Sequence, residues 1–351
     1  MERLRRLLPP LALAAACLLC AALAHFFSRP RGADAAPAGA VQPATARCFA
    51  FPIFNTQATL TLYDPPGPAV NAAVRDILDR LSELHRTVNA YDPDSELSRL
   101  NATAAHTPFA CSPLLWDILL RAEQAWTLSD HLFDATVGPL LKLWGFRTKQ
   151  GQLPSDDDIQ AARRLVGFDK LILDRQQHTV RFPSDGMSLD FGGIAKGYAL
   201  HLAIDIARQH GLQAFLIDLG GNIFCSETHL PPLDAYTVGV RNPRDHDRTV
   251  ATVTLAGQCV ATSGNYERFR IIQGQRIGHI MDPRTGRPAA PPQHYEGVTA
   301  VTIDPTLSDV CSTTAFVGGP DVAAKLAERL PGSSFIFVSF DDSGNPIVQK
   351  F

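Results

Sequence analysis

The chain has 351 residues, of which 45% are hydrophobic and 19% are charged. These proportions predict a folded protein with a substantial core and argue against an intrinsically disordered chain. The formal net charge is −3, and the sequence has no run of basic residues with interleaved aromatics, so its composition does not favour nucleic acid as a partner.

A largely apolar segment lies at the start of the chain. Arg3, Arg5 and Arg6 precede this segment, residues 7–27. A basic stretch before an apolar one is typical of an export signal, whereas the alternative, a buried apolar helix, gives no reason for the arginines. We therefore expect residues 1–27 to be either a cleaved signal peptide or a retained anchor in the inner membrane, with the rest of the chain in the periplasm.

The next segment, residues 28–48, is rich in alanine, proline and glycine and is predicted to be a flexible linker. The folded body is expected over residues 49–351. Seven cysteines occur in the chain, and those outside the leader are scattered, with no C-x-x-C pair and no histidine at metal-ligand spacing. The sequence leaves both disulfides and buried thiols open for them.

Hydrophobic periodicity and end signals predict alternating helices and strands in the body. Helices are expected over residues 70–88, from a Ser112 N-cap to about residue 128, over 194–210 ending at Gly211, and over 309–317. Strands are expected over residues 59–63, 214–219, 236–240, 249–255, 298–303 and 334–340. This mixture predicts an α+β fold, organised as a single large domain of mixed sheets and helices.

The strongest local motif is Asp190-Phe191-Gly192-Gly193-Ile194-Ala195-Lys196-Gly197-Tyr198. Glycines before a predicted helix let the backbone approach a ligand closely, and the helix N-terminus offers unpaired N–H groups. Lys196 adds a full positive charge, so the motif predicts a phosphate site. The spacing of a Walker A loop is absent. The alternative is a helix start with a structural role alone.

A second motif runs from Gly278 to Gly286 and contains His279, Asp282 and an Asp-Pro-x-Thr-Gly turn. Such a turn would present His279 and Asp282 from a loop, where they suit acid/base work or cation binding. The alternative is a capped turn with an incidental histidine.

A third motif, Ser308 to Thr313, places Asp309 and Thr313 four residues apart. On a helix both side chains would lie on one face, and a carboxylate with a hydroxyl suits a hard cation such as Mg²⁺. The alternative is an aspartate favoured by the helix dipole in the first turn, with a threonine that hydrogen-bonds to the backbone.

Two further stretches complete an ordered set of motifs. The set is Y-D-P-D-S-E-L-S-R-L-N from Tyr91, F-D-A-T-V-G-P-L from Phe133, D-F-G-G-I-A-K-G-Y from Asp190, A-T-S-G-N-Y from Ala261 leading into H-I-M-D-P-R-T-G from His279, and S-D-V-C-S-T-T from Ser308. With this set the chain resembles the ApbE family, the FAD:protein FMN transferases, over about residues 49–351. The ordered motifs are far more specific together than any one alone.

The resemblance implies an enzyme that binds FAD with Mg²⁺ and transfers FMN through a phosphoester bond to a Thr or Ser of a partner redox protein, releasing AMP. It implies metal contacts from Asp309, Thr313 and the backbone carbonyl of Gly193. The residues implied to border or contact FAD are Tyr91, Leu132, Phe133, Asp134, Asp190, Lys196 and Ile280. His279 or Asp282 would accept the proton of the acceptor hydroxyl.

The chain departs from the family pattern at two places. Phe54-Asn55-Thr56 stands where relatives often carry Met-Gly-Thr, so Phe54 is predicted as an altered cofactor contact. Cys311-Ser312 is more polar than the small apolar residues usual there. Two other functions remain open: hydrolysis of FAD to FMN and AMP, and non-catalytic flavin carriage for a respiratory complex.

Overall fold

The computed structural model describes residues 46–147, 153–229, 235–290 and 295–351. The predicted leader and nearly all of the predicted linker lie outside the described residues. The folded part begins at Arg47 in β1, slightly before the predicted start at Phe49. Among the described residues, no helix is both long and apolar enough to cross a membrane.

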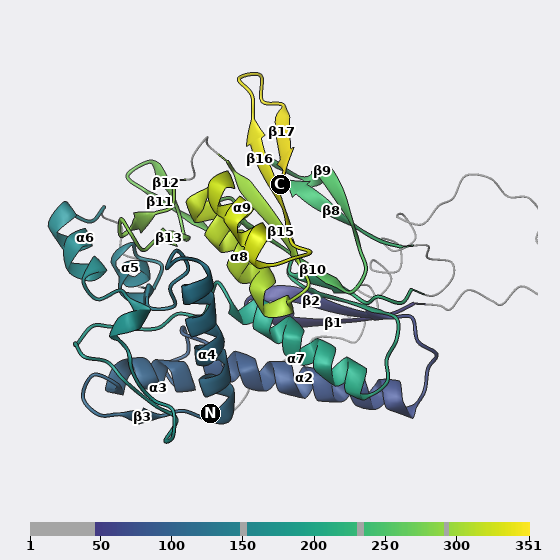
Figure 1. The fold of residues 1–351 in the computed structure, drawn as a ribbon, viewed down its shortest axis with the longest axis horizontal. Helices are drawn as coiled ribbons and strands as arrows, with labels where there is room; N and C mark the ends of the chain where they lie inside the picture. The colour runs from purple at the N-terminus through teal and green to yellow at the C-terminus, as the bar shows by residue number, and fades with distance from the viewer. Residues whose placement is uncertain (1–45, 148–152, 230–234, 291–294) are drawn as a thin grey trace, which may run out of the picture.

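The centre of the fold is an eight-stranded sheet with the order β1-β2-β6-β7-β10-β15-β16-β17, and each pair of neighbours is antiparallel (Figure 1). Its strands are β1 (Arg47–Ile53), β2 (Thr56–Leu62), β6 (Phe215–Leu219), β7 (Ile223–Cys225), β10 (Gln258–Gly264), β15 (Gly297–Thr302), β16 (Ser334–Phe340) and β17 (Pro346–Lys350). All six residues of β15 are buried. This explains why its sequence reads as a continuous apolar and small-residue run rather than an alternating one.

Three long helices cover one face of this sheet: α2 (Pro68–Val88), α7 (Ala195–Gln209) and α8 (Pro305–Gly318) (Figure 1). The other helices around them are α3 (Glu96–Thr103), α4 (Pro113–Leu128), α5 (Gly138–Leu143), α6 (Asp156–Arg163), α9 (Pro320–Arg329) and the 3₁₀ turn η1 (Phe168–Lys170). The apolar stripe of α2 packs on the core as its periodicity predicts. At α4, the Ser112 hydroxyl accepts a hydrogen bond from the Leu115 N–H at 3.3 Å, which confirms the predicted N-cap.

The start of α8 differs from its prediction. The helix begins at Pro305, because Asp304 is an N-cap whose carboxylate accepts hydrogen bonds from the backbone N–H groups of Thr306 and Leu307. An Asp-Pro pair is a typical N-cap and first helical residue. Asp309 is therefore beyond the first turn of the helix, and the alternative that the dipole alone explains it is wrong.

Smaller sheets of two or three strands lie outside the central sheet. They are β8 (Tyr236–Asn242) with β9 (Asp245–Leu255), β11 (Phe269–Ile272) with β12 (Gln275–Gly278), β13 (Met281–Asp282) with β14 (Arg287–Pro288), and the set β3 (Phe109–Ala110), β5 (Thr179–Arg181), β4 (Ile172–Asp174). Helices segregated to one side of an antiparallel sheet define an α+β fold, so the predicted fold class is confirmed.

The cysteines of the body divide by burial. Cys225, Cys259 and Cys311 are buried thiols and Cys111 is a partly buried one. Burial raises the pKa of the Cys225 and Cys311 thiols to about 12. For these residues the structure therefore favours the inert buried thiol over the disulfide.

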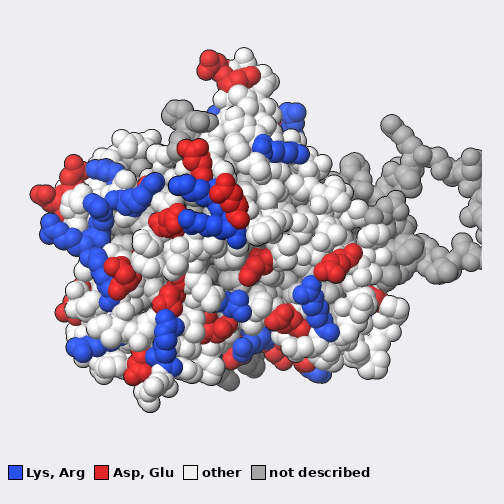
Figure 2. Space-filling model, in the orientation of Figure 1, with Lys and Arg blue, Asp and Glu red and all other residues white. Residues whose placement is uncertain are grey.

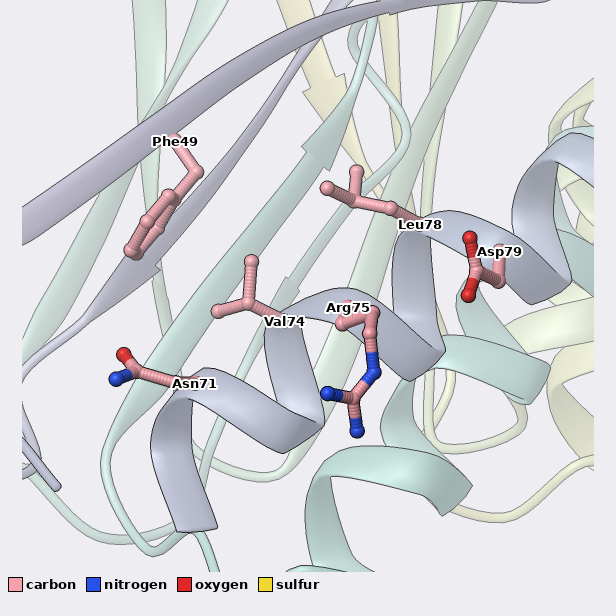
Figure 3. A pocket seen from close by; sticks show the side chains of 6 residues that line it. All are labelled: Phe49, Asn71, Val74, Arg75, Leu78 and Asp79. Carbon is pink, nitrogen blue, oxygen red and sulfur yellow. The ribbon is translucent and has the colours of Figure 1, made fainter. Parts of the chain in front are cut away.

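A groove of about 350 Å³ lies between β1 and the N-terminal half of α2 (Figure 3). Phe49, Val74 and Leu78 give it an apolar floor, and Arg75 and Asp79 stand on the helix beside them. None of the predicted site residues lines this groove. Tyr91 lies beyond the other end of α2, and a helix rises about 1.5 Å per residue, so the groove is separate from the site described below.

Candidate functional site

A tight turn connects Asp190 to the start of α7. The Asp190 carboxylate accepts a hydrogen bond from the Gly192 N–H at 2.7 Å, and the Asp190 N–H donates to the Ala135 carbonyl at 2.7 Å. At Ile194, the N-cap of α7, no side chain caps the helix. The N–H groups of Ile194 and Ala195 donate to the Phe191 carbonyl at 3.0 and 2.8 Å. The N–H groups of Lys196 and Gly197, next in the first turn of α7, have no partner within the helix and could serve a ligand.

Lys196 in the first turn of α7 meets Asp309 of α8. The Lys196 ammonium lies 3.1 Å from the Asp309 Oδ1, and the two side chains are 26% and 6% exposed. The helices approach closely because Gly197 faces the start of α8: a Cβ on Gly197 would come within 2.6 Å of the Thr306 carbonyl oxygen. The motif that contains Lys196 and the motif that contains Asp309 are far apart in sequence, and this ion pair joins them.

Three hydroxyl groups gather next to Asp309. The Ser263 hydroxyl on β10 lies 2.9 Å from that of Ser312 and 3.1 Å from that of Thr313. A Cβ on Gly193 would lie 3.7 Å from the Thr313 hydroxyl oxygen and 3.2 Å from the Phe133 ring. Gly193 therefore lies close to Thr313, which is four residues from Asp309 on α8.

The donor set at this point suits a hard cation. A buried carboxylate, a threonine hydroxyl and a nearby backbone segment supply oxygen atoms, which Mg²⁺ prefers. The described part of the chain has no group of three or more His, Cys, Asp or Glu side chains that could hold a metal. A site here would therefore need further ligands from water or from a substrate phosphate, as is usual for Mg²⁺ in phosphoryl-transfer sites.

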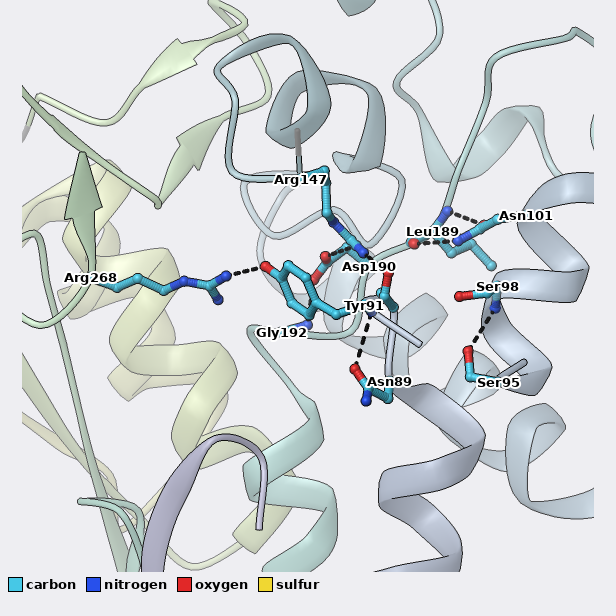
Figure 4. A network of polar contacts seen from close by, with 11 residues as sticks. Asn89, Tyr91, Ser95, Ser98, Asn101, Arg147, Leu189, Asp190, Gly192 and Arg268 are labelled. Carbon is cyan, nitrogen blue, oxygen red and sulfur yellow. Dashed lines mark hydrogen bonds and ion pairs between the residues drawn. The ribbon is translucent and has the colours of Figure 1, made fainter. Parts of the chain in front are cut away.

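A polar network surrounds Tyr91, which lies in the turn between α2 and α3 and is 47% exposed (Figure 4). The guanidinium of Arg147 lies 4.8 Å from the centre of the Tyr91 ring, and that of Arg268 lies 5.2 Å from it. Arg268 also donates a hydrogen bond to the Tyr91 hydroxyl, and Arg147 forms an ion pair with Asp190. Arg147 thus links Tyr91 to Asp190, and Arg268 contacts Tyr91 from a second segment.

His279 lies between β12 and β13 and points its Nδ1 at the Arg268 carbonyl oxygen, 2.9 Å away. Because a carbonyl only accepts, Nδ1 carries the proton and Nε2 is left as an acceptor. Burial of the ring, together with the positive charges of Arg268 and Lys196, lowers the pKa of His279 to about 4. The imidazole is therefore neutral at physiological pH and able to accept a proton.

Asp282 differs from His279 in its contacts. It is the second residue of the short strand β13 rather than part of a loop. Its two carboxylate oxygens accept hydrogen bonds from the Arg284 guanidinium at 3.0 and 2.8 Å, and Oδ1 also accepts from the Arg284 N–H. These contacts hold the turn, and they leave Asp282 less available than His279 for proton transfer.

The remaining predicted residues surround the site in different ways. Leu132 and Ile280 are buried in one hydrophobic cluster, which also contains Cys311 of α8, and Phe133 packs beside Gly193. The Asp134 carboxylate accepts hydrogen bonds from Thr136 and from the Phe168 N–H, and burial raises its pKa. Both carboxylate oxygens of Asp134 therefore accept hydrogen bonds inside the protein, and these bonds hold the loop around Phe133.

Phe54 occupies the turn between β1 and β2. Ile53 pairs with Thr56, so Phe54 and Asn55 form a two-residue turn, with φ angles of 49° and 59°. Such a type I′ turn favours Gly and Asn, and a bulky residue there is strained. The Phe54 ring packs edge-on against His85, with 5.4 Å between ring centres. The departure from the family's Met-Gly-Thr thus falls on a strained residue.

Three residues of this region were not singled out from the sequence: Arg147, Arg268 and Ser263. Ser263 lies within the A-T-S-G-N-Y motif, so the motif itself could have indicated it. The arginines had no such signal, because each reaches Tyr91 from a distant segment.

The comparisons with known proteins agree with this arrangement. The model of the ApbE family matches residues 54–337. The chain is similar to an FAD:protein FMN transferase of Klebsiella pneumoniae (31% identity over 272 residues, 77% of this chain and 82% of the relative). It is also similar to one of Treponema pallidum (30% identity, 78% of each chain).

Solved structures give the same result. The crystal structure of the Pseudomonas stutzeri flavinyl transferase ApbE in its apo form superposes with a TM-score of 0.76 at 29% identity, covering 87% of this chain and 94% of that one. The matched region contains every predicted site residue from Phe54 to Thr313, and the chain therefore belongs to the ApbE family.

Proposed function

We propose that this enzyme is an FAD:protein FMN transferase that requires Mg²⁺, attaches FMN to a Thr or Ser hydroxyl of a partner redox protein and releases AMP. One observation carries the proposal: at the N-terminus of α7, Lys196, Asp309 and Thr313 converge beside a Gly-Gly turn. This arrangement combines a phosphate-binding helix start with oxygen donors for a cation.

The parts of FAD would be divided between the two halves of the site. The pyrophosphate would lie at the N-terminus of α7, where backbone N–H groups and the Lys196 ammonium bind its oxygens. The flavin nucleotide would lie among Tyr91, Phe133 and Leu132, which offer aromatic and apolar surface for a planar ring. Phe54, Asp134, Asp190 and Ile280 remain predicted neighbours of FAD.

Asp309, Thr313 and the carbonyl of Gly193 would hold Mg²⁺. Bound there, the cation would neutralise charge on the phosphate oxygens as AMP leaves. The ammonium of Lys196 now neutralises Asp309, so Lys196 would turn from this carboxylate to the pyrophosphate when substrate and metal are present. Ser263 would position the Thr313 hydroxyl through the 3.1 Å contact.

The transfer step would form one bond and break one. The acceptor hydroxyl oxygen attacks the phosphorus on the FMN side, and the bond from that phosphorus to the oxygen of the AMP half breaks. The proton of the hydroxyl passes to Nε2 of His279, which is unprotonated at neutral pH. Asp282 remains a predicted alternative base.

The location of the enzyme is part of the proposal. Residues 1–27 would direct export and residues 28–48 would tether the body, placing a transferase domain of residues 49–351 in the periplasm, either released or held at the inner membrane. The arginines near the N-terminus support this orientation.

The test is mass spectrometry of a purified redox-protein domain after incubation with residues 46–351, FAD and Mg²⁺. A Thr or Ser that gains the mass of FMN, only with metal present, supports the proposal. Release of FMN and AMP without an adduct, across several candidate acceptors, would indicate FAD hydrolysis instead. Intact FAD would favour a carrier.

A further inference from the structure

The hairpin formed by β11 and β12 connects two residues of the site. Arg268, which contacts Tyr91, immediately precedes β11, and His279 immediately follows β12. The hairpin is therefore continuous with the place where the acceptor hydroxyl would be deprotonated. Its two faces differ in burial.

The inner face of this hairpin is fixed to the body. Ile272 and Ile277 are 1% and 9% exposed and pack in a cluster with Leu140, Trp144 and Met281. The Arg270 guanidinium donates to the Gly145 carbonyl at 2.5 Å. The hairpin thus has a defined position relative to α5 and to the site, which a docking surface needs.

The outer face is apolar and exposed. Phe269 and Ile271 are two residues apart on β11, so they lie on the same face, and they are 43% and 61% exposed. Arg276 is directly opposite Ile271 in the register, and its guanidinium lies 3.9 Å from the centre of the Phe269 ring. Large exposed apolar side chains beside a planar arginine are typical of protein interfaces.

The charge of the hairpin is positive. Arg268 and Arg276 donate to the Tyr91 hydroxyl and to the Tyr266 carbonyl, which are uncharged acceptors, so neither of these contacts neutralises the guanidinium. Figure 2 shows Lys and Arg side chains gathered over the part of the molecule where Figure 1 places β11 and β12. This field favours a partner that carries carboxylates.

We propose that the outer face of the β11–β12 hairpin, made by Phe269, Ile271 and Arg276, is the docking surface for the acceptor protein. The acceptor segment next to the modified Thr or Ser would place an apolar side chain on Phe269 and Ile271 and a carboxylate on Arg276. A four-residue strand is about 13 Å long, so roughly four residues of an extended segment would follow the hairpin towards His279. This inference rests on the proposed function.

The test uses a purified redox-protein domain that the wild-type enzyme flavinylates. Ile271→Ser and Arg276→Glu should each raise the KM for this domain at least about fivefold, which corresponds to about 1 kcal/mol, as expected of side chains at the centre of an interface. The Kd for FAD and the kcat at saturating acceptor should not change. The matched control is Ile347→Ser on β17, an isoleucine that is 42% exposed and should leave all three constants unchanged.

A cross-linking measurement does not depend on activity. A photoreactive benzoyl-phenylalanine at position 271 should form a covalent adduct with the same domain, and one at position 347 should not. An unchanged KM in both hairpin variants, or equal cross-linking from the two positions, would overturn the inference while flavinylation by the wild type stands. A dimer that Ile271→Ser dissociates without any change in KM would assign the face to a second copy and overturn it as well.

The two proposals fail in different ways. If the wild-type enzyme attaches FMN to no candidate domain, the proposed transferase function is wrong, and the docking surface is wrong with it. If the wild-type enzyme transfers FMN and the hairpin variants have the same KM for the acceptor domain as the wild type, the proposed function stands and the docking surface alone is wrong.

Discussion

At the scale of single residues, Asp309 combines burial with an ion pair and a nearby hydroxyl on the same helix. Its carboxylate lies 3.1 Å from the Lys196 ammonium, and Thr313 stands one helical turn further along α8. A carboxylate so placed can neutralise Lys196 or bind a hard cation, and its amide analogue does both poorly.

Asp309→Asn is therefore expected to lower FMN transfer about 100-fold or more and to weaken its dependence on Mg²⁺, a loss typical of removing one electrostatic group from an active site. The measurement is the rate of AMP release across a Mg²⁺ titration. Asp321→Asn, at an exposed position in the first turn of α9, is the control and should keep the wild-type rate. Full activity in Asp309→Asn would refute the metal assignment.

His279 provides a prediction on pH. The pKa of its ring is lowered to about 4, first by burial and then by Arg268. Because the folded pKa is below 6.5, the base stays unprotonated as pH falls through 6.5 and is lost only near pH 4. The acid limb of kcat/KM should therefore lie well below pH 6.5. Arg268→Gln should move this limb towards higher pH.

His279→Asn separates the positioning role from the proton transfer. The amide still donates to the Arg268 carbonyl but offers no comparable base, so kcat should fall about 100-fold or more. Binding of FAD, followed by flavin fluorescence, should change little. A variant that keeps both kcat and the wild-type pH profile would show that another group, such as Asp282, takes the proton.

At the scale of elements, the crossing of α7 and α8 decides the geometry of the site. A Cβ on Gly197 would lie 2.6 and 2.7 Å from the carbonyl oxygens of Thr306 and Pro305, so the helices have no room for a methyl group. Lys196 and Asp309 lie on either side of this contact.

Gly197→Ala should force α7 and α8 apart. We expect a loss of about 1–3 kcal/mol in the free energy of unfolding, as for other overpacked sites, and a larger proportional loss of FMN transfer, because the pair between Lys196 and Asp309 is stretched. Urea unfolding and the transfer rate are the measurements. Gly67→Ala, where a Cβ meets nothing within 4 Å, is the matched control. Equal stability of both variants would refute the close-approach argument.

A substitution in the turn between β1 and β2 should affect FAD binding without a matching change in stability. Phe54 has a φ of 49°, in the left-handed region that costs a residue with a Cβ about 1–2 kcal/mol. In Phe54→Gly this strain is relieved while the ring contact with His85 is lost, so the free energy of unfolding should change little. The Kd for FAD, measured by titration, should nevertheless rise if the ring borders the cofactor. An unchanged Kd would give Phe54 a structural role alone.

At the scale of the whole molecule, the central sheet runs from β1 at one edge to β17 at the other. The backbone of Phe351 exchanges two hydrogen bonds of 2.9 Å with Phe335, so the C-terminal residues belong to the sheet. The sheet and its core are built from residues after position 45, so a protein that lacks residues 1–45 should fold and cleave FAD at the full-length rate. A much lower rate would show that the N-terminal segment takes part in catalysis.

The sequence by itself determined much of this protein. The α+β class and the long helices and strands follow from periodicity and end signals such as Ser112-Pro113, because each signal is local. The Gly-Gly-x-x-Lys turn and the spacing of Asp309 and Thr313 are also signals contained within a few neighbouring residues. They indicated phosphate and cation chemistry before any fold was known, and the order of the motifs indicated the family.

Only the tertiary structure decided which groups meet. Lys196 and Asp309 are 113 residues apart and pair because α7 and α8 cross at Gly197. Arg147 and Arg268 reach Tyr91 from separate segments, and Asp282 is held by Arg284 while His279 keeps a free Nε2. Periodicity reports which face of one element is buried, whereas these contacts depend on how several elements pack, and no local pattern encodes that.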